Sequence, residues 1–299
     1  MLWGVVNNPS HYAKRLLERA GGAKARECID FLLDVFEKYQ IPATWAVVGH
    51  LFLDPCHRKG DSLPKHESRF TNSLSMDICT NSYDNALFFG KDIVEKILSS
   101  KVGHEIGYHS FSHQVFSKIC KEVADSEIKA GIEIAKQFNI SFKSFVFPED
   151  EIGHIDVLKK YGFLIYRGKT LVRWRNLRSH MPKIDGLFNE TVALPVMPNW
   201  KDGIWEIPSS MYFTDPKYPF CLLPKARLGL WRTMRSNSAR AVFHVTMHPW
   251  NLLEYPSLSK DFECFIRHVS RRSAESKIRV MTMGELASDL QRPRAARQG

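Results

Sequence analysis

The stretch GHEIGYHSFSH at residues 103–113 places two histidines, His109 and His113, four positions apart at the end of a short apolar run. The run at residues 105–109 predicts a strand, and His109 stands at its end. Two imidazoles at this spacing can point the same way if a helical turn follows the strand. Two nitrogen ligands suit a divalent metal such as zinc. The segment therefore predicts a metal site at the end of a strand.

A third histidine, His248, also ends a predicted strand. It follows the run AVFHVTM at residues 241–247 and begins the sequence HPWN. A single histidine is more often a hydrogen-bonded structural residue, but three histidines at strand ends favour a functional site. The other histidines considered are interpreted as loop or surface residues: His57, His66, His154 and His180.

Short apolar runs alternate with segments of helical period along most of the chain. The pattern predicts strands at residues 43–48, 105–109, 144–147, 163–166, 204–207, 241–247 and 278–281. It predicts helices at residues 23–40, 91–99, 126–138, 155–161, 224–236, 260–272 and 284–290. Repeated strand–helix units indicate an α/β protein with a parallel sheet, either open or closed into a barrel. In a barrel, reactive residues gather at the carboxyl ends of the strands.

The length of 299 residues fits one large α/β domain, and no internal repeat or low-complexity linker divides it. We expect a single domain over residues 1–290 and a basic tail at residues 291–299. Residues 54–89 are polar and lack a strong period, which indicates an insertion loop.

Basic residues exceed acidic ones, 42 to 32, which gives a net charge of +10. Part of the excess lies in two late segments, RHVSRR at residues 267–272 and RPRAAR at residues 292–297. Attraction to a polyanion is one interpretation. A solvent-exposed helix face and a chain terminus are the simpler one, and we favour it. Because no zinc-finger or RNA-binding motif accompanies the charge, nucleic acid is not the expected partner.

The six cysteines form no C-x-x-C pair, which favours free thiols in a reducing compartment. No apolar stretch of 18 residues predicts a membrane span, and the first residues do not read as a secretory signal. The sequence therefore predicts a cytoplasmic location.

Residues 103–113 resemble the G-H-E-I-x-x-H-[ST]-x-x-H segment of the polysaccharide deacetylases, the NodB-homology or carbohydrate esterase family 4 group. Other stretches agree in the family's order. They are IPATWAVVG at residues 41–49, SFVFP at 144–148, LKKYGFLIYRG at 158–168, and His248. The resemblance extends from the first residues to about Leu290, and the double-histidine segment is its most specific part.

The resemblance implies a distorted (β/α) barrel that removes N-acetyl groups from sugars with a divalent metal, most commonly zinc. It implies that His109 and His113 are metal ligands together with an aspartate, and that His248 is the general acid. Trp250 is a candidate substrate-binding wall for the sugar ring, and a role as an ordinary packed aromatic residue is equally open.

The start of the chain departs from the family pattern. The family's first strand ends in an aspartate motif, which in one branch reads D-x-E and is followed shortly by W-G. This chain begins MLWG at residues 1–4, so the Trp-Gly is retained while the acidic strand is not. Asp30 and Asp34 fall within the first predicted helix and do not replace the motif. Either a longer parent chain supplies a first strand that the barrel here lacks, or the aspartates have been lost.

The third family motif carries an arginine beside its proline, and here Pro148 is followed by Glu149 and Asp150. These carboxylates could supply a ligand or a base, but at a strand-to-helix loop we favour roles as helix caps and dipole partners. Arg167 belongs to a later strand, which makes it a poor substitute for the missing arginine.

Three functions remain open from the sequence. The first is a metal-dependent hydrolase of amide bonds that deacetylates an N-acetylated sugar or polysaccharide, or acts on a related small amide. The second is a catalytically impaired carbohydrate-binding relative of the same fold. The third is a protein that binds polyanions through its basic surface.

Overall fold

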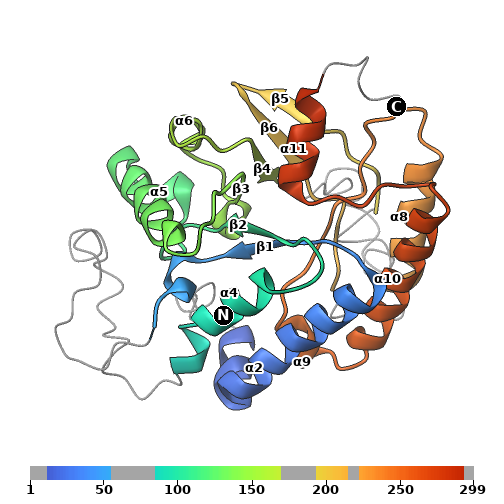
Figure 1. Ribbon diagram of the computed structural model, residues 1–299, viewed down its shortest axis with the longest axis horizontal. Coiled ribbons are helices and arrows are strands. Elements are labelled where there is room, and N and C mark those ends of the chain that lie inside the picture. Colours follow the sequence, from blue (N-terminus) through green and yellow to red (C-terminus); the bar gives the residue numbers. More distant parts are fainter. Residues whose placement is uncertain (1–11, 55–84, 170–192, 215–221, 293–299) are drawn as a thin grey trace, which may run out of the picture.

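The structure is a computed structural model that describes residues 12–54, 85–169, 193–214 and 222–292 (Figure 1). Its main sheet has six strands and a second sheet has two. In spatial order the main sheet contains β1 (Thr44–Val47), β2 (Glu105–Tyr108), β3 (Ser144–Val146), β4 (Ile165–Gly168), β6 (Ile204–Pro208) and β5 (Asn199–Lys201). The second sheet pairs β7 (Met211–Tyr212) with β8 (Val245–Thr246) in parallel.

Helices form an outer layer around these strands (Figure 1). They are α2 (Tyr12–Tyr39), α4 (Lys91–Leu98), α5 (Lys121–Lys136), α6 (Ile155–Lys160), α8 (Leu222–Met234), α9 (Asn251–Glu254), α10 (Leu258–Ala274) and α11 (Met283–Gln291). Short 3₁₀ helices follow several strands: η1 (Gly49–Phe52), η2 (Asn85–Leu87), η3 (Phe116–Lys118) and η4 (Pro148–Asp150).

The strands from β1 to β4 are neighbours in chain order and parallel, with α4, α5 and α6 in the connections. This arrangement arises because each strand–helix unit returns the chain to the same end of the sheet. The sheet curls into part of a barrel, so the predicted α/β class and the distorted (β/α) barrel are confirmed (Figure 1). The carboxyl ends of the parallel strands therefore lie along the same edge of the sheet.

The predicted helices and strands are found with small shifts in most cases. Helix α5 begins at Lys121 instead of residue 126, and β4 begins at Ile165 instead of residue 163. Residues 55–84 of the predicted insertion lie outside the described part of the chain. Its last residues, Leu87, Phe88 and Phe89, are buried, so they belong to the core instead of a polar loop.

Sequence periodicity did not reveal the short strands β5 and β7. Strand β5 pairs antiparallel with β6 through a turn at Asp202 and Gly203, which both have positive φ, 51° and 86°. Two such residues are typical of the tight turn that suits the twist of a hairpin. Trp200 then packs edge-on against Trp205, with ring centroids 5.0 Å apart.

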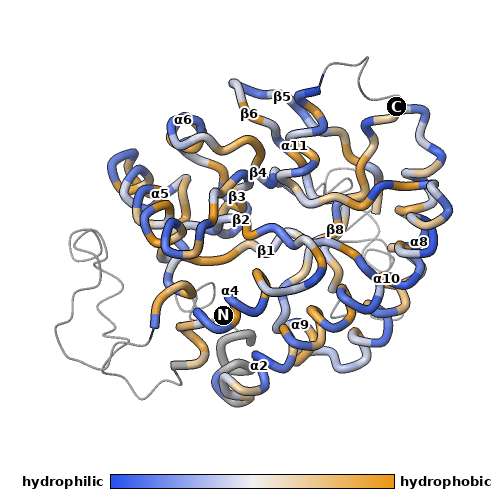
Figure 2. Tube along the Cα trace, viewed as in Figure 1, coloured by the Kyte–Doolittle hydropathy of each residue, from blue (hydrophilic) through white to orange (hydrophobic). Residues whose placement is uncertain are grey.

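The core beneath the main sheet is rich in aromatic side chains, and apolar residues follow the strands while polar ones face outward on the helices (Figure 2). Tyr108 is fully buried, and its hydroxyl donates to the Glu127 carbonyl oxygen at 2.7 Å. A Cβ on Gly131 would lie 2.0 Å from the Tyr108 ring. The absence of a side chain at this position lets α5 approach β2 closely.

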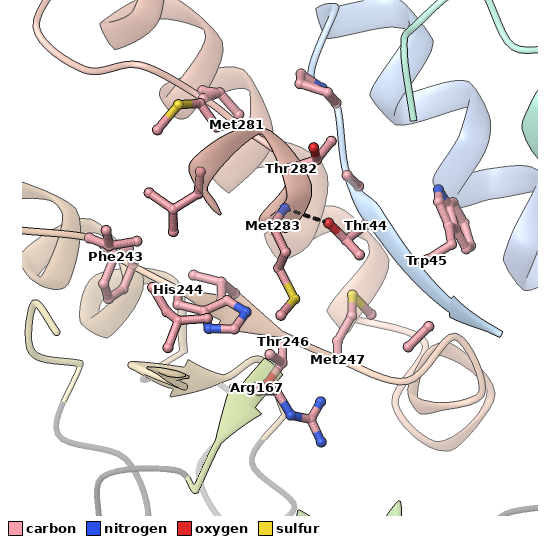
Figure 3. Close-up of a pocket in the computed structure, with 18 of the residues that line it drawn as sticks. Thr44, Trp45, Arg167, Phe243, His244, Thr246, Met247, Met281, Thr282 and Met283 are labelled. Atoms are coloured by element: carbon pink, nitrogen blue, oxygen red, sulfur yellow. Dashed lines mark hydrogen bonds between the residues drawn. The ribbon is translucent and has the colours of Figure 1, made fainter. Parts of the chain in front are cut away.

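Strand β1 pairs with β2 on one side, and within the described ranges no strand pairs with its other edge. Residues 278–281 were predicted as a strand, and this prediction is wrong: they line the same cavity as β1 without pairing to a strand. The start of α11 is nevertheless tied to the sheet. The Met283 N–H donates to Thr44 Oγ1 at 2.8 Å (Figure 3). The Gly284 N–H donates to Glu105 Oε2 at 2.8 Å.

Among the residues that the structure places, no helix has both the length and the apolar character to cross a bilayer. Three of the six cysteines are described, Cys28, Cys120 and Cys264, and all are free thiols. The single-domain boundaries and the cytoplasmic location stay predictions.

Candidate functional site

A large cavity of about 2260 Å³ extends along the whole of β1 and reaches the carboxyl ends of β2, β3 and β4. Its wall includes all four residues singled out in the sequence: His109, His113, His248 and Trp250. It exceeds the usual size of a small-molecule pocket, which is about 300–1,000 Å³. One side, between β1 and the segment that leads into α11, is largely apolar and is lined by Met281 and Met283 (Figure 3).

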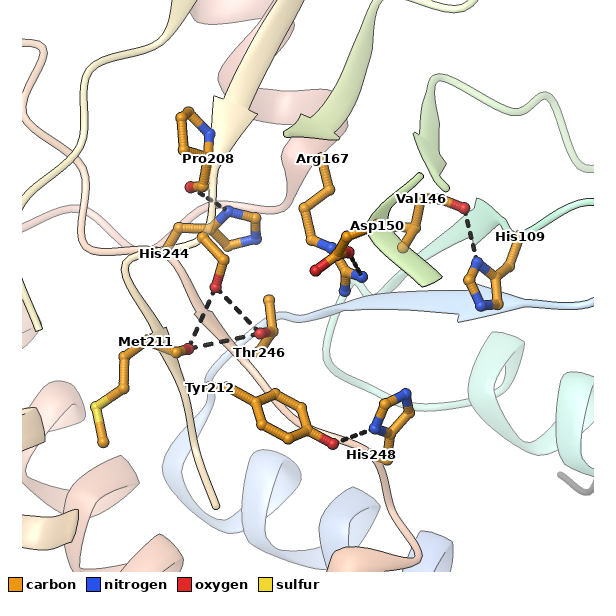
Figure 4. A network of polar contacts seen from close by, with 11 residues as sticks. His109, Val146, Asp150, Arg167, Pro208, Met211, Tyr212, His244, Thr246 and His248 are labelled. Atoms are coloured by element: carbon orange, nitrogen blue, oxygen red, sulfur yellow. Dashed lines mark hydrogen bonds and ion pairs between the residues drawn. The ribbon is translucent and has the colours of Figure 1, made fainter. Parts of the chain in front are cut away.

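His109 follows β2 directly, and the centroids of its ring and the His113 ring lie 4.7 Å apart. The Nδ1 of His109 lies 2.7 Å from the Val146 carbonyl oxygen (Figure 4). A carbonyl oxygen only accepts hydrogen bonds, so Nδ1 carries the proton and Nε2 keeps its lone pair. This is the form of histidine that binds metals, with the second nitrogen fixed by a backbone acceptor.

The two histidines meet across a loop and not across a helical turn, which corrects the expected local geometry. Ser110 and His113 both have φ of 60°, in the left-handed region. Such conformations in residues other than glycine cost free energy and tend to occur at functional sites.

The buried carboxylate of Glu127, on α5, holds this loop in place. Its Oε2 accepts from the N–H groups of Phe111 and Ser112 at 2.8 and 2.9 Å, and its Oε1 accepts from Ser112 Oγ at 2.7 Å. Both loop residues stand between the two histidines. The helix therefore sets the separation and orientation of the two imidazoles.

Burial and nearby positive charge favour the neutral form of the cavity histidines. Burial lowers the pKa of His113 to about 4, and it lowers the pKa of His109 well below the usual value, with His113 and Arg167 adding to the effect. Burial also lowers the pKa of His244 to about 4, with a contribution from Arg167. His248 is exposed, and its pKa is lowered as well, by partial loss of surrounding water and by the nearby charge of Arg167. Neutral imidazoles are available as ligands and as proton acceptors near neutral pH.

We expect the metal-free protein to lose stability as the pH falls from 6.5 to 4. The pKa of His113 is lower in the folded chain than its ordinary value of 6.5, so in this range the unfolded state binds a proton that the folded state does not. The shift to about 4 corresponds to a loss of about 3 kcal/mol in the free energy of unfolding, at 1.36 kcal/mol per pKa unit.

Urea unfolding at several pH values, with a chelator present, measures this loss. His113→Gln removes the titrating group, and its free energy of unfolding should fall by about 3 kcal/mol less than that of the wild type over the same range. Parallel pH dependences for the two proteins would contradict the prediction.

Arg167, at the end of β4, forms an ion pair with Asp150 in η4 (Figure 4). From the sequence, Arg167 was expected to be a poor substitute because it lies in a later strand, and that strand proves to be the direct neighbour of β3. Strand β4 neighbours β3 with Val146 opposite Arg167, so the arginine emerges beside the loop after β3. Glu149 and Asp150 both have positive φ, 56° and 57°, and both line the cavity with Arg167.

His248 follows β8 and is held between two aromatic side chains. Trp250 stacks on its ring, with centroids 5.1 Å apart and planes inclined by 16°. The Tyr212 hydroxyl, from β7, hydrogen-bonds to its Nδ1 (Figure 4). Asn251 joins both, because its Oδ1 accepts from the Tyr212 hydroxyl at 3.0 Å and from the His248 backbone N–H at 2.9 Å.

Sequence reasoning missed Tyr212 and His244, which also line the cavity. His244 Nδ1 lies 3.0 Å from the Pro208 carbonyl oxygen. This contact links the end of β6 to the residue that precedes β8. No local motif marks either residue. Their position becomes apparent only when β7 and β8 pair.

The expected zinc ion would need nitrogen, sulfur or oxygen ligands from side chains at the cavity. Two imidazoles at one loop fit zinc by ligand type, and the fixed Nδ1–H of His109 supports this. Catalytic zinc usually has three protein ligands. In the described part of the chain, however, no group of three His, Cys, Asp or Glu side chains could hold a metal. Among the described residues, His109 and His113 are thus two candidate ligands where a catalytic zinc site usually has three.

The basic segment at residues 267–272 lies on α10, where Arg271 and Arg272 form ion pairs with Glu275. Residues 293–297 of the other basic segment lie outside the described chain. Binding of a polyanion to this surface stays a prediction.

Comparison with known protein families finds a match between residues 22–163 and the polysaccharide deacetylase family. These residues contain the double-histidine segment and the strands β1 to β3. The resemblance inferred from residues 103–113 is thereby confirmed. Comparison with curated proteins finds no match.

Solved structures of similar fold were also found. A polysaccharide deacetylase, described as putative, from Mycobacterium smegmatis is 16% identical with a TM-score of 0.60, and the match covers 96% of this chain and 85% of that one. A probable polysaccharide deacetylase from Pseudomonas aeruginosa PAO1 is 13% identical with a TM-score of 0.55, over 92% and 75% of the two chains. The allantoinase Puue is 12% identical with a TM-score of 0.57, over 92% and 74%. At these identities the likeness establishes the fold.

Proposed function

Since the chain is a member of the polysaccharide deacetylase family, of the NodB-homology type, we propose that it is a metal-dependent hydrolase that deacetylates an N-acetylated carbohydrate. One observation carries the proposal. His109, His113 and His248 come from the ends of two strands in different sheets and line one cavity. Core packing alone does not require three neutral imidazoles at one cavity wall.

In this proposal His109 and His113, which both line the cavity, would hold the metal. A bound divalent metal lowers the pKa of its water and polarises the amide carbonyl. His248 would take up a proton released when water attacks and, as general acid, deliver it to the nitrogen that leaves with the sugar. Trp250 has one face against His248, and its cavity-lining part is the proposed wall for a sugar ring.

Asp150 is the proposed base. It lies at the cavity with Arg167 as its ion-pair partner, and a carboxylate at this place can accept a proton from water. A carboxylate thus follows Pro148, at the place where the family motif has its arginine, and the arginine stands on the next strand, β4. Glu149 is adjacent, but its ion-pair partner is Lys118.

Acetate release from N-acetylated chito-oligosaccharides tests the proposal. We expect release by the purified chain with added zinc, loss of release after chelation, and recovery when zinc is restored. Asp150→Asn should lower kcat by about 100-fold or more, as expected for loss of a general base, while zinc content stays unchanged. Asp156→Asn, on the exposed face of α6, is the matched control. No zinc-dependent release from any acetylated oligosaccharide would refute the proposal.

A second candidate is a catalytically impaired relative that binds carbohydrate. The observation that favours it is the set of only two metal ligands among the described residues. This candidate predicts binding of the oligosaccharide without acetate release and without bound zinc. Isothermal titration with the same oligosaccharides, in parallel with the release assay, separates the two candidates.

A further inference from the structure

The hydrogen bonds around His248 can be traced from a group whose role is fixed. A backbone N–H can only donate, and the N–H of His248 lies 2.9 Å from one side-chain atom of Asn251. That atom must therefore be the amide oxygen and not the amide nitrogen. The backbone thus fixes the orientation of the Asn251 side chain, which is almost completely buried.

The Tyr212 hydroxyl has a single proton, so it can donate only one hydrogen bond. The amide oxygen of Asn251 only accepts, so the Tyr212 hydroxyl, 3.0 Å away, donates its proton to it. The same hydroxyl oxygen contacts Nδ1 of His248. With its proton already given to Asn251, it acts there as an acceptor. Nδ1 of His248 must then carry a hydrogen.

The other nitrogen of the ring, Nε2, is left with the lone pair. Figure 4 shows it on the side of the ring that is turned away from Tyr212. Trp250 lies flat on the ring, which limits rotation of the imidazole. The ring is therefore fixed both in plane and in tautomer.

We propose that Tyr212 and Asn251 are positioning residues that hold His248 as the Nδ1–H tautomer, with Nε2 as the nitrogen that takes up and delivers the proton. A tyrosine and an asparagine do here what a carboxylate does for many catalytic histidines, but without placing a negative charge beside the ring. The catalytic consequence rests on the proposed function. The assignment of the tautomer is independent of the proposed function.

Nitrogen-15 NMR of the metal-free protein tests the tautomer directly. The protein is labelled at the histidine ring nitrogens and held at a pH at which His248 is neutral, and the His248 signals are assigned with His248→Gln. We expect the proton on Nδ1 in the wild type. In Tyr212→Phe we expect a shift toward the Nε2–H form. Tyr161→Phe removes a hydroxyl that bonds to Asp125 away from the cavity and should leave the His248 signals unchanged.

An Nε2–H form in the wild type, or an unchanged spectrum in Tyr212→Phe, would overturn the proposal. With active protein, Tyr212→Phe should lower kcat by about 10- to 100-fold with little change in KM, the size usual for residues that support a catalytic group. If the spectra agree and no substrate is hydrolysed, the proposed function fails and the tautomer assignment stands. If hydrolysis occurs and the wild-type tautomer is the other one, this inference alone fails.

Discussion

Replacing His113 with alanine is expected to remove zinc from the protein and to lower kcat/KM for acetate release by more than about 100-fold, because even residues that only support a ligand contribute 10- to 100-fold. The imidazoles of His109 and His113 are in edge contact at this cavity, with ring centroids 4.7 Å apart and planes inclined by 83°. Losing one leaves a single nitrogen ligand from the described chain, too few for a divalent ion to stay bound.

Zinc content by atomic absorption and initial rates of acetate release measure the two effects separately. His268→Ala is the matched control, since this histidine lies on α10 and does not line the cavity. Thermal unfolding of both variants shows whether a loss of activity reflects unfolding. A His113→Ala protein that keeps its zinc would exclude this residue as a ligand, and one that keeps its activity would remove the basis of the hydrolase proposal.

Elements with a strong period of their own were predictable from sequence because their apolar faces are encoded locally. Helix α4 and strand β3 appear within a residue or two of the prediction. The run at residues 241–247 shows the limit of this argument. Its composition suits a strand, but only Val245–Thr246 are assigned, since the partner strand β7 is equally short. Strand formation depends on an edge to pair with, and a single sequence does not show where that edge lies.

The site residues, too, were predictable only where the signal is local in the sequence. His109 and His113 were found because their spacing is local, and His248 because it follows a recognisable run. Arg167 and Tyr212 reach the cavity only through the neighbours of their strands, β3 and β8. The position of Arg167 has a signal in hindsight. In a parallel sheet, residues at the ends of adjacent strands meet at one edge, so an arginine at the end of the next strand could replace one expected beside Pro148.

Glu127→Ala is expected to lower the free energy of unfolding by about 4 kcal/mol or more, because three buried donors lose their acceptor at about 1–3 kcal/mol each. The donors are the N–H groups of Phe111 and Ser112 and the hydroxyl of Ser112. The Glu127 residue is 3% exposed, so water replaces its carboxylate poorly. Since these donors lie in the loop between His109 and His113, zinc affinity should fall as well.

A pair of comparison variants makes this prediction specific. In Glu127→Gln the amide oxygen can accept from both N–H groups while the amide nitrogen donates to Ser112 Oγ, so a loss of only about 1–2 kcal/mol is expected, from the weaker neutral hydrogen bonds. Glu133→Ala removes a carboxylate that is mostly exposed on the same helix, and it should change stability by less than about 0.5 kcal/mol. Urea unfolding of the three variants should place Glu127→Ala well below Glu127→Gln in stability, with Glu133→Ala close to the wild type. Equal losses for the two substitutions of Glu127 would mean that packing volume, and not the hydrogen bonds to the histidine loop, explains the role of this residue.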